Sequence, residues 1–269
     1  MNHQNNFLKV ISPFQLLVLG YLVITTLGAF LLSCPIATKN NQWQNYLDAL
    51  FVASSAISTS GLTVVDIGSF YTIFGQIVLM IIFQIGGIGY MTLLMFVLYL
   101  FDVKTSLSVQ ITAKESLSGP TLKILGKFFT VTIIFTLLFE IGGALILSLF
   151  WLQYYDGVHA IYYGLFHSIS AFCTAGFSLF PDSLMNYRNS VVINIIINGI
   201  SLAGGIGFIV LFEIVILIKR KYHGIKRKSL SIHSKLVLVT TFIIIIAGTM
   251  LLLFATPIFS ANVLMAEGV

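Results

Sequence analysis

The chain reads ASSAISTSGLTVVD over Ala53–Asp66, a small, hydroxyl-rich and turn-prone stretch between two strongly apolar segments. A second stretch of the same kind, SAFCTAGFS over Ser170–Ser178, places Gly176 115 residues after Gly61. Irregular backbone at membrane depth is tolerated only where it is buried in protein or lines a watery cavity. The sequence therefore predicts that the rest of the chain holds these two loops inside a membrane.

The composition excludes a soluble domain. Of the 269 residues, 58% are hydrophobic and 9% are charged, and the mean hydropathy is +1.01. Nine acids and fourteen bases are too few to solvate the surface of a soluble domain of this size. The two cysteines, Cys34 and Cys173, form neither a disulfide framework nor a metal-ligand spacing. We therefore predict an all-α integral membrane protein, with the lipid bilayer as its surroundings and no nucleic acid among its partners.

Apolar segments long enough for the roughly 20 residues of a bilayer crossing occur five times. They cover residues 14–32, a stretch beginning near Thr72, and residues 128–152, 191–218 and 236–255. Two apolar segments, Leu47–Ser58 and Ala160–Cys173, are too short to cross and directly precede the small-residue loops. The order of span, short re-entrant helix, loop and span thus occurs twice, and the fifth span begins a third unit. We predict repeats at residues 1–103 and 104–221, with an incomplete third repeat at 222–269.

The positively charged residues predict the orientation. Twelve of the fourteen Lys and Arg residues fall in segments on one face of the membrane, and the exceptions are Lys39 and Arg188. Cytoplasmic loops carry an excess of such residues. The sequence therefore predicts a multi-pass protein of the cell membrane with a cytoplasmic N-terminus and with both small-residue loops open to the outside.

The chemistry of the two loops suits a cation. A short helix that stops inside the membrane directs its C-terminal carbonyls, the negative end of its dipole, toward the loop that follows. Backbone carbonyls of that loop can then replace the water shell of an ion. Gly61 and Gly176 allow the close approach and the backbone angles that a larger residue forbids. The residues before them are small enough to crowd around an axis: Ser58, Thr59, Ser60, Cys173, Thr174 and Ala175.

Further motifs carry a resemblance to a known family. FGQ at 74–76 and QIGGIG at 84–89 follow the first loop, FHSISAF at 166–172 precedes the second, and HSKL at 233–236 opens the third unit. Together with the loops, these motifs resemble the Trk/Ktr/HKT superfamily of potassium transporters, in particular a Ktr-type membrane subunit. The resemblance extends to about residue 255.

The resemblance implies potassium transport through a filter of backbone carbonyls, with a role for sodium left open and no cofactor or enzymatic activity. The implied filter residues are Ser58, Thr59, Ser60, Gly61, Leu62, Cys173, Thr174, Ala175, Gly176 and Phe177. It also implies a cytoplasmic nucleotide-binding regulatory subunit, for which the basic residues between 219 and 228 are docking candidates.

The family has four such repeats around one pore, whereas this chain has two loops, and its residues 260–269 do not resemble a third pore helix. We therefore expect a C-terminally truncated member. Moving a small ion into a low-dielectric interior costs on the order of tens of kcal/mol, and two loops supply only half of the carbonyl oxygens that offset this cost in the family. Two alternatives follow: a non-conducting fragment or assembly element, or a homodimer that rebuilds four loops. An intramembrane enzyme is disfavoured because the spans hold no catalytic arrangement of Ser and His, of two Asp, or of His-Glu-x-x-His.

Two glycine motifs lie inside the spans, at Gly86, Gly87 and Gly89 and at Gly204, Gly205 and Gly207. No strand precedes them, which argues against nucleotide binding. Small residues let helix backbones approach closely, so we favour helix packing and keep a hinge as the alternative.

Four other polar residues need a role. Glu140 lies in the middle of a span, and we favour an anchor bonded by a neighbouring pore helix over an ion relay. For His167 we favour packing over a ligand or relay role. Asp66 suits cation attraction and helix capping equally, and Glu213 lies close enough to the end of its span to reach the headgroups.

Overall fold

The structure is a computed structural model that describes residues 13–89, 122–222 and 230–266. In these ranges the regular elements are helices, together with an isolated antiparallel bridge between Thr38 and Tyr71. The predicted all-α class is confirmed. The chain forms two compact units, Met1–Gly205 and Ile206–Val269, which are described separately.

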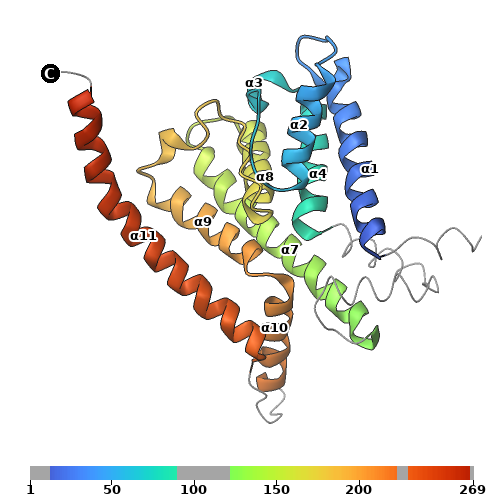
Figure 1. The fold of residues 1–269 in the computed structure, drawn as a ribbon, viewed down its shortest axis with the longest axis vertical. Coiled ribbons are helices and arrows are strands. Elements are labelled where there is room, and N and C mark those ends of the chain that lie inside the picture. The colour runs from blue at the N-terminus through green and yellow to red at the C-terminus, as the bar shows by residue number, and fades with distance from the viewer. Residues whose placement is uncertain (1–12, 90–121, 223–229, 267–269) are drawn as a thin grey trace, which may run out of the picture. The chain divides into compact units, whose positions relative to one another are not determined.

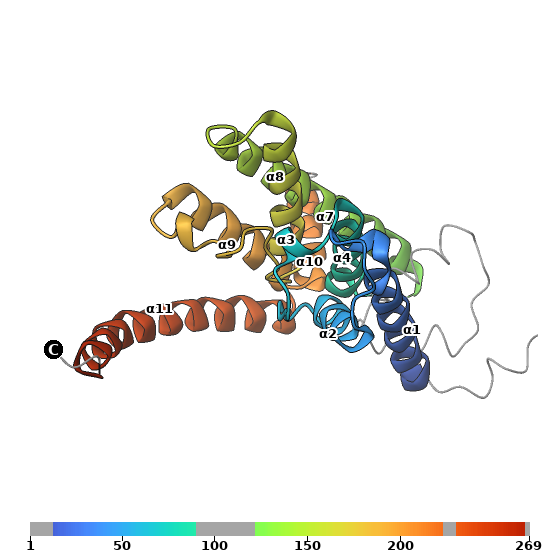
Figure 2. The same ribbon diagram turned by 90° about the horizontal axis from the view of Figure 1, so that it is seen from above.

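Three helices pack against one another in the N-terminal half of the first unit (Figure 1): α1 (Pro13–Ser33), α2 (Tyr46–Ile57) and α4 (Ile73–Ile88). Two short elements, η2 (Pro35–Ala37) and α3 (Ile67–Phe70), lie in the connections between them. Figure 2 shows the same group from above. The short helix α2 begins and ends within one residue of its predicted bounds.

Side-chain caps explain where these helices begin. Asn45 accepts a hydrogen bond from the Leu47 amide at 3.0 Å, which satisfies one of the free N–H groups at the start of α2. Thr72 serves α4 in the same way through the Gly75 amide at 3.4 Å. At its other end α4 stops at Gly89, whose φ of +83° is one that glycine adopts readily.

The second half of this unit has the same order of long helix, short helix and further helix, here α7 (Leu122–Trp151), α8 (Gly157–Phe172) and α9 (Val191–Gly205). The short element η3 (Met185–Tyr187) lies between α8 and α9. Helix α8 packs against both α7 and α9, and α4 contacts α8 and so joins the two halves. Leu147, Trp151, Ala160 and Ile193 form a buried apolar cluster where α7, α8 and α9 meet. The short helix α8 begins three residues before its predicted start, at Gly157 rather than Ala160.

The span predicted over residues 191–218 is not one continuous helix. Helix α9 ends at Gly205, and α10 (Phe208–Tyr222) begins after Ile206 and Gly207. The φ of Gly207 is +93°, which no residue of a right-handed helix adopts, and glycine has a low helix propensity. The sequence prediction missed this break because the apolar pattern continues across it.

The second unit contains α10 and α11 (Ile232–Ala266), which pack against each other. The Ser231 amide donates a hydrogen bond of 3.1 Å to the Glu213 carboxylate, which joins the segment before α11 to α10. Glu213 therefore has a protein partner within this unit.

Among the described residues, Phe128–Trp151 and Ile232–Phe254 are long and apolar enough to cross a membrane, and α9 with α10 adds a third if they form one broken span. Val18–Ser33 and Ile73–Ile88 are apolar but shorter. The continuation of the second predicted span beyond Gly89, the repeat boundary at 103–104 and most of both basic loops lie outside the described residues. The repeat boundaries therefore stay predictions.

Candidate functional site

The two small-residue loops have the same backbone conformation. Thr59 and Thr174 have φ angles of 53° and 52°, and Gly61 and Gly176 have angles of 73° and 72°. Each pair is separated by 115 residues. Only a few per cent of non-glycine residues adopt a positive φ, and for a β-branched residue it is a genuine outlier. The agreement at both positions shows that the loops are built alike although their sequences differ.

Both loops begin with the same helix ending. After α2, the Thr59 amide donates to the Ala56 carbonyl at 3.2 Å and the Ser60 amide donates to Ser55 at 3.0 Å. After α8, Thr174 and Ala175 donate to Ala171 and Ser170 at 3.0 and 2.8 Å. This is the Schellman pattern, whose left-handed residue is usually glycine. Here threonine occupies it, and its hydroxyl donates to the preceding carbonyl at 2.8 Å in the first loop and 2.7 Å in the second.

The loops touch at their glycines. A Cβ atom added to Gly61 would lie 2.7 Å from the Ala175 carbonyl oxygen and 3.2 Å from the Cα atom of Gly176. A Cβ atom added to Gly176 would lie 3.6 Å from the Cα atom of Gly61, which is an ordinary contact. The fold therefore brings together two segments that are more than 100 residues apart, and Gly61 has no space for a side chain.

The predicted filter residues differ in exposure between the loops. Ser58, Ser60 and Leu62 are exposed, and Leu62 is 59% accessible. In the second loop Cys173, Ala175 and Phe177 are buried, whereas Thr174 and Gly176 are exposed. Phe177 packs in a stacked arrangement on Phe83 of α4, with ring centroids 6.0 Å apart. The first loop is thus more open than the second.

Several loop carbonyls have no protein partner. Among the described residues, the structure gives no hydrogen bond to the main-chain oxygens of Thr59, Ser60, Gly61, Thr174, Ala175 and Gly176. Oxygens of this kind are ligands for hard monovalent cations. The described residues contain no cluster of three His, Cys, Asp or Glu side chains that would hold a metal ion.

The two glycine motifs lie against the ends of the short helices. A Cβ atom at Gly86 would lie 2.1 Å from the Ile57 carbonyl oxygen, and one at Gly204 would lie 1.7 Å from that of Phe172. Ile57 and Phe172 are the last residues of α2 and α8. A Cβ atom added to Gly87 would lie 2.7 Å from the Cβ atom of Cys173, whereas one added to Gly205 would make only an ordinary contact of 3.8 Å with Thr174.

The third glycine of each motif, Gly89 and Gly207, instead has a positive φ at the point where a helix ends. Within each motif, the first glycine therefore allows the close approach of a short helix, and the third lies where its own helix ends.

Glu140 is 4% exposed and bonded on two sides. Its carboxylate accepts a hydrogen bond of 2.6 Å from the Gln84 amide on α4, and its main-chain oxygen accepts one of 2.7 Å from Ser168 on α8. The Gln84 oxygen in turn accepts a bond of 3.2 Å from the Cys173 thiol. The expected pore-helix partner thus contacts the backbone of Glu140 and not its carboxylate. The sequence prediction passed over Gln84, although a polar residue between apolar ones in a span was a usable signal.

His167 joins the second short helix to the segment after its loop. The ring nitrogen Nδ1 lies 2.8 Å from the Tyr163 carbonyl oxygen, which can only accept, so this nitrogen carries the proton. Nε2 then accepts from the Leu179 amide at 3.4 Å and lies 3.0 Å from the Ser178 hydroxyl. With both nitrogens engaged inside the protein, the geometry fits a packing role.

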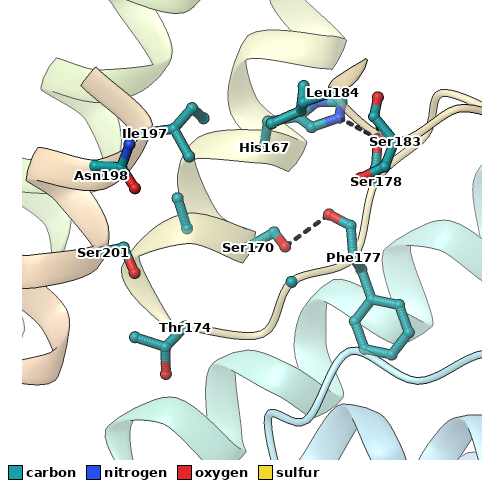
Figure 3. A pocket seen from close by; sticks show the side chains of 12 residues that line it. His167, Ser170, Thr174, Phe177, Ser178, Ser183, Leu184, Ile197, Asn198 and Ser201 are labelled. Carbon is teal, nitrogen blue, oxygen red and sulfur yellow. Dashed lines mark hydrogen bonds between the residues drawn. The ribbon is translucent and has the colours of Figure 1, made fainter. Parts of the chain in front are cut away.

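An open pocket of about 170 Å³ lies between the second loop and α9. Figure 3 shows Asn198 and Ser201 of α9 on one side, and Ser170 and Thr174 on another. The Ser170 hydroxyl donates to the Phe177 carbonyl at 2.8 Å, which fixes one wall. The pocket offers polar groups and room for water beside the loop.

Asp66 caps α3, since its carboxylate accepts a hydrogen bond of 3.2 Å from the Gly68 amide. Of the two roles that its sequence position suits, the structure places it in the capping one. The connection that it begins also contacts the segment after the second loop, because a Cβ atom at Gly68 would lie 1.9 Å from the Leu179 carbonyl oxygen.

Comparison with known proteins gives a consistent result. The family described as TrkH, cation transport protein, matches residues 1–266. The chain is 38% identical to Ktr system potassium uptake protein B of Bacillus subtilis (strain 168), over 87% of this chain and 50% of that protein. It is 37% identical to the protein of the same name from Vibrio alginolyticus, over 88% and 50%. Potassium/sodium uptake protein NtpJ of Enterococcus hirae is 31% identical, over 91% and 53%. The chain spans about half the length of these curated relatives.

Proposed function

The chain belongs to the TrkH family of cation transport proteins, and from this premise we propose that it passes potassium across the cell membrane along its two glycine loops. The family is one of transporters and not of enzymes, and the chain is a membrane protein. Two of the relatives are named potassium uptake proteins, which supports potassium as the transported substrate.

The observation that carries the proposal is the contact between the loops. Gly61 and Gly176 have matching positive φ angles and lie against each other, and the main-chain oxygens on either side accept no hydrogen bond from any residue that the structure describes. Main-chain oxygens can replace the water shell of a potassium ion. The carbonyl ends of α2 and α8 lead into the loops and favour positive charge there. We therefore assign the filter to Ser58–Leu62 and Cys173–Phe177.

We propose that the chain assembles as a homodimer, in which the loops of one copy face those of the other. The first loop supports this proposal because Ser58, Ser60 and Leu62 are exposed and leave room for a neighbour. Chemical cross-linking in the membrane, followed by mass measurement of the product, tests the dimer. A product of one chain only at every cross-linker concentration contradicts it.

Two further features belong to the same proposal. The protein would be oriented with its N-terminus in the cytoplasm, and a cytoplasmic nucleotide-binding subunit would dock near the basic residues between 219 and 228. One relative is named a potassium/sodium uptake protein, so potassium uptake is to be compared with and without sodium.

The test is potassium uptake by cells that lack their own uptake systems and express the 269-residue chain. We expect growth at low potassium and uptake of rubidium as a tracer, measured with and without sodium. Gly61→Asp should abolish both, because it introduces a side chain where a Cβ atom alone would lie 2.7 Å from a carbonyl oxygen.

The matched control is Gly142→Ala in α7, where an added Cβ atom meets nothing within 4 Å. This variant should transport like the unmodified chain. If the unmodified chain reaches the membrane but takes up no potassium, the conducting function is wrong for this chain. The non-conducting fragment or assembly element is then the better description.

A further inference from the structure

Helix α4 belongs to the first predicted repeat and is hydrogen-bonded to the second at two levels. Near its start, Gln76 accepts a hydrogen bond of 2.7 Å from the Tyr162 hydroxyl on α8. Two turns later, Gln84 bonds both Glu140 on α7 and Cys173 at the end of α8. Gln76 is held in place by the Tyr71 carbonyl, to which its amide donates at 3.0 Å. Only the second level reaches a filter loop.

Every polar atom of the Gln84 side chain that faces the second repeat has a matching partner. The amide nitrogen donates to the Glu140 carboxylate at 2.6 Å, and the amide oxygen accepts from the Cys173 thiol at 3.2 Å. Glu140 and Cys173 are 4% and 3% exposed, so water does not readily replace either partner. A buried carboxylate without a hydrogen-bond donor is costly, and this one depends on Gln84.

Cys173 is the residue at which α8 ends and the second loop begins. Its amide still donates to the Ile169 carbonyl of the helix, and the next residue, Thr174, has the left-handed backbone. Helix α4 also approaches Cys173 through Gly87, where an added Cβ atom would lie 2.7 Å from the Cβ atom of Cys173. The base of the second loop is therefore held by α4 through both a hydrogen bond and direct packing.

The first loop has no such tether among the described residues. Its corresponding residue, Ser58, donates its hydroxyl to the Ser54 carbonyl of its own helix at 2.7 Å and is exposed. The two loops thus share a backbone conformation and close packing of α4 on the preceding helix end, but only the second has a hydrogen bond from α4 at its base. Packing alone does not require this difference, since Ser58 and Cys173 are of similar size.

We propose that Gln84 and Glu140 are positioning residues that fix the second loop through Cys173, and that this tether sets the preference of the filter for potassium over sodium. The proposal rests on the proposed function for its second half. A filter distinguishes cations by the number and placement of its oxygens, so a loop released at its base discriminates less well. The Glu140 carboxylate acts through Gln84 and does not itself contact the ion.

The tether itself is tested through the reactivity of the Cys173 thiol. In a Cys34→Ser background Cys173 is the only thiol, and its reaction with N-ethylmaleimide in detergent is followed by the mass of the intact protein. Gln84→Leu and Glu140→Leu should each raise the alkylation rate about fivefold to tenfold, the effect of losing one hydrogen bond. The double variant Gln84→Glu/Glu140→Gln exchanges amide and carboxylate and keeps a donor and an acceptor in each contact. Its rate should return to that of the parent or fall below it, because a carboxylate beside the thiol also disfavours the reactive thiolate.

Tyr162→Phe is the matched control, because it removes the other hydrogen bond between α8 and α4 without touching the loop. Its alkylation rate should equal that of the parent. A rise as large as that of Gln84→Leu would mean general loosening and would overturn the proposal. An unchanged rate in Gln84→Leu would also overturn it. Unfolding temperatures are measured for every variant, and rates are compared well below them.

The second half is tested by the ratio of potassium to sodium uptake in cells. Gln84→Leu should lower this ratio, the exchanged double variant should restore it, and Tyr162→Phe should leave it unchanged. A fall in total uptake at constant ratio overturns the assignment to selectivity. If the unmodified chain takes up no potassium, the proposed function fails, and the thiol rates alone still decide whether the tether exists.

Discussion

The backbone angles of Gly61 and Gly176 are alike, but their surroundings are not. A Cβ atom added to Gly61 would lie 2.7 Å from the Ala175 carbonyl oxygen, which is too close. One added to Gly176 would have its nearest neighbour at 3.6 Å, which is an ordinary contact. Both substitutions carry the cost of a positive φ, about 1–2 kcal/mol. At Gly61 the backbone of the other loop must move as well.

We therefore expect Gly61→Ala to damage the site more than Gly176→Ala. The unfolding temperature in detergent should fall further for Gly61→Ala than for Gly176→Ala. Potassium uptake should be lost in Gly61→Ala, whereas Gly176→Ala should retain a reduced uptake. Equal effects of the two substitutions would show that the positive φ alone matters and that the contact between the loops does not.

The threonines at the left-handed positions explain part of the sequence pattern. Glycine is the usual residue there, and threonine carries a cost of about 1–2 kcal/mol. Backbone strain of this kind persists at functional sites when the surroundings hold it. The pattern of small hydroxyl residues predicted loops at these positions, and the backbone there is irregular, with a positive φ at both glycines. It did not reveal the strained positions, because φ angles depend on the hydrogen bonds that end each helix.

His167 provides a second prediction for a single residue. The His167 ring stacks on Phe180, with ring centroids 4.9 Å apart. Replacing His167 by Phe keeps an aromatic ring for this stacking but leaves the buried Leu179 amide without an acceptor. An unsatisfied buried donor costs about 1–3 kcal/mol. We expect the unfolding temperature of His167→Phe to fall by several degrees, measured by circular dichroism in detergent.

His159 on the same helix is the control. It lies 2.6 Å from the Asp156 carboxylate, and the hydrogen bond lowers the pKa of that carboxyl, but both side chains are more than half exposed. Exposed pairs contribute little to stability. His159→Phe should leave the unfolding temperature nearly unchanged, and an equal fall in both variants would contradict the role given to His167.

At the scale of helices, length and apolar pattern predicted most of the elements. The short helix α2 and the long helix α7 lie within a few residues of their predicted bounds, except that α7 begins earlier, at Leu122. The break between Gly205 and Phe208 was not predicted, because apolar residues continue through it. The hydrogen bond between Gln84 and Glu140 was not predicted, since the two residues are 56 positions apart and no local pattern links them.

Adjacent glycines of α9 give a prediction at this scale. A Cβ atom at Gly204 would lie 1.7 Å from the Phe172 carbonyl oxygen, whereas one at Gly205 would have its nearest contact at 3.8 Å. Gly204→Ala should therefore push α9 away from the end of α8 and lower the unfolding temperature by several degrees. Gly205→Ala should be neutral or slightly stabilising, because alanine is the better helix former. Similar losses in both variants would contradict close packing as the role of Gly204.

At the scale of the whole chain, the arrangement of charge makes the last prediction. Lys39 and the polar residues after it lie between α1 and α2, while the basic residues from 219 to 228 belong to the last turn of α10 or follow it in the sequence. If the excess of positive charge marks the cytoplasmic side, these two segments lie on opposite sides of the membrane. Burial and hydrogen bonding give no information on this point, because they are the same in either orientation.

One cysteine added at Asn40 or at Lys226, in a Cys34→Ser background that keeps the buried Cys173, tests the orientation. A membrane-impermeant maleimide added to intact cells should label Asn40→Cys at once and Lys226→Cys only after permeabilisation. The parent with Cys173 alone should stay unlabelled, since that thiol is buried. Immediate labelling of Lys226→Cys with protection of Asn40→Cys would reverse the topology, and the two loops would then open toward the cytoplasm. In that case the carbonyl ends of α2 and α8 would favour a cation arriving from inside the cell.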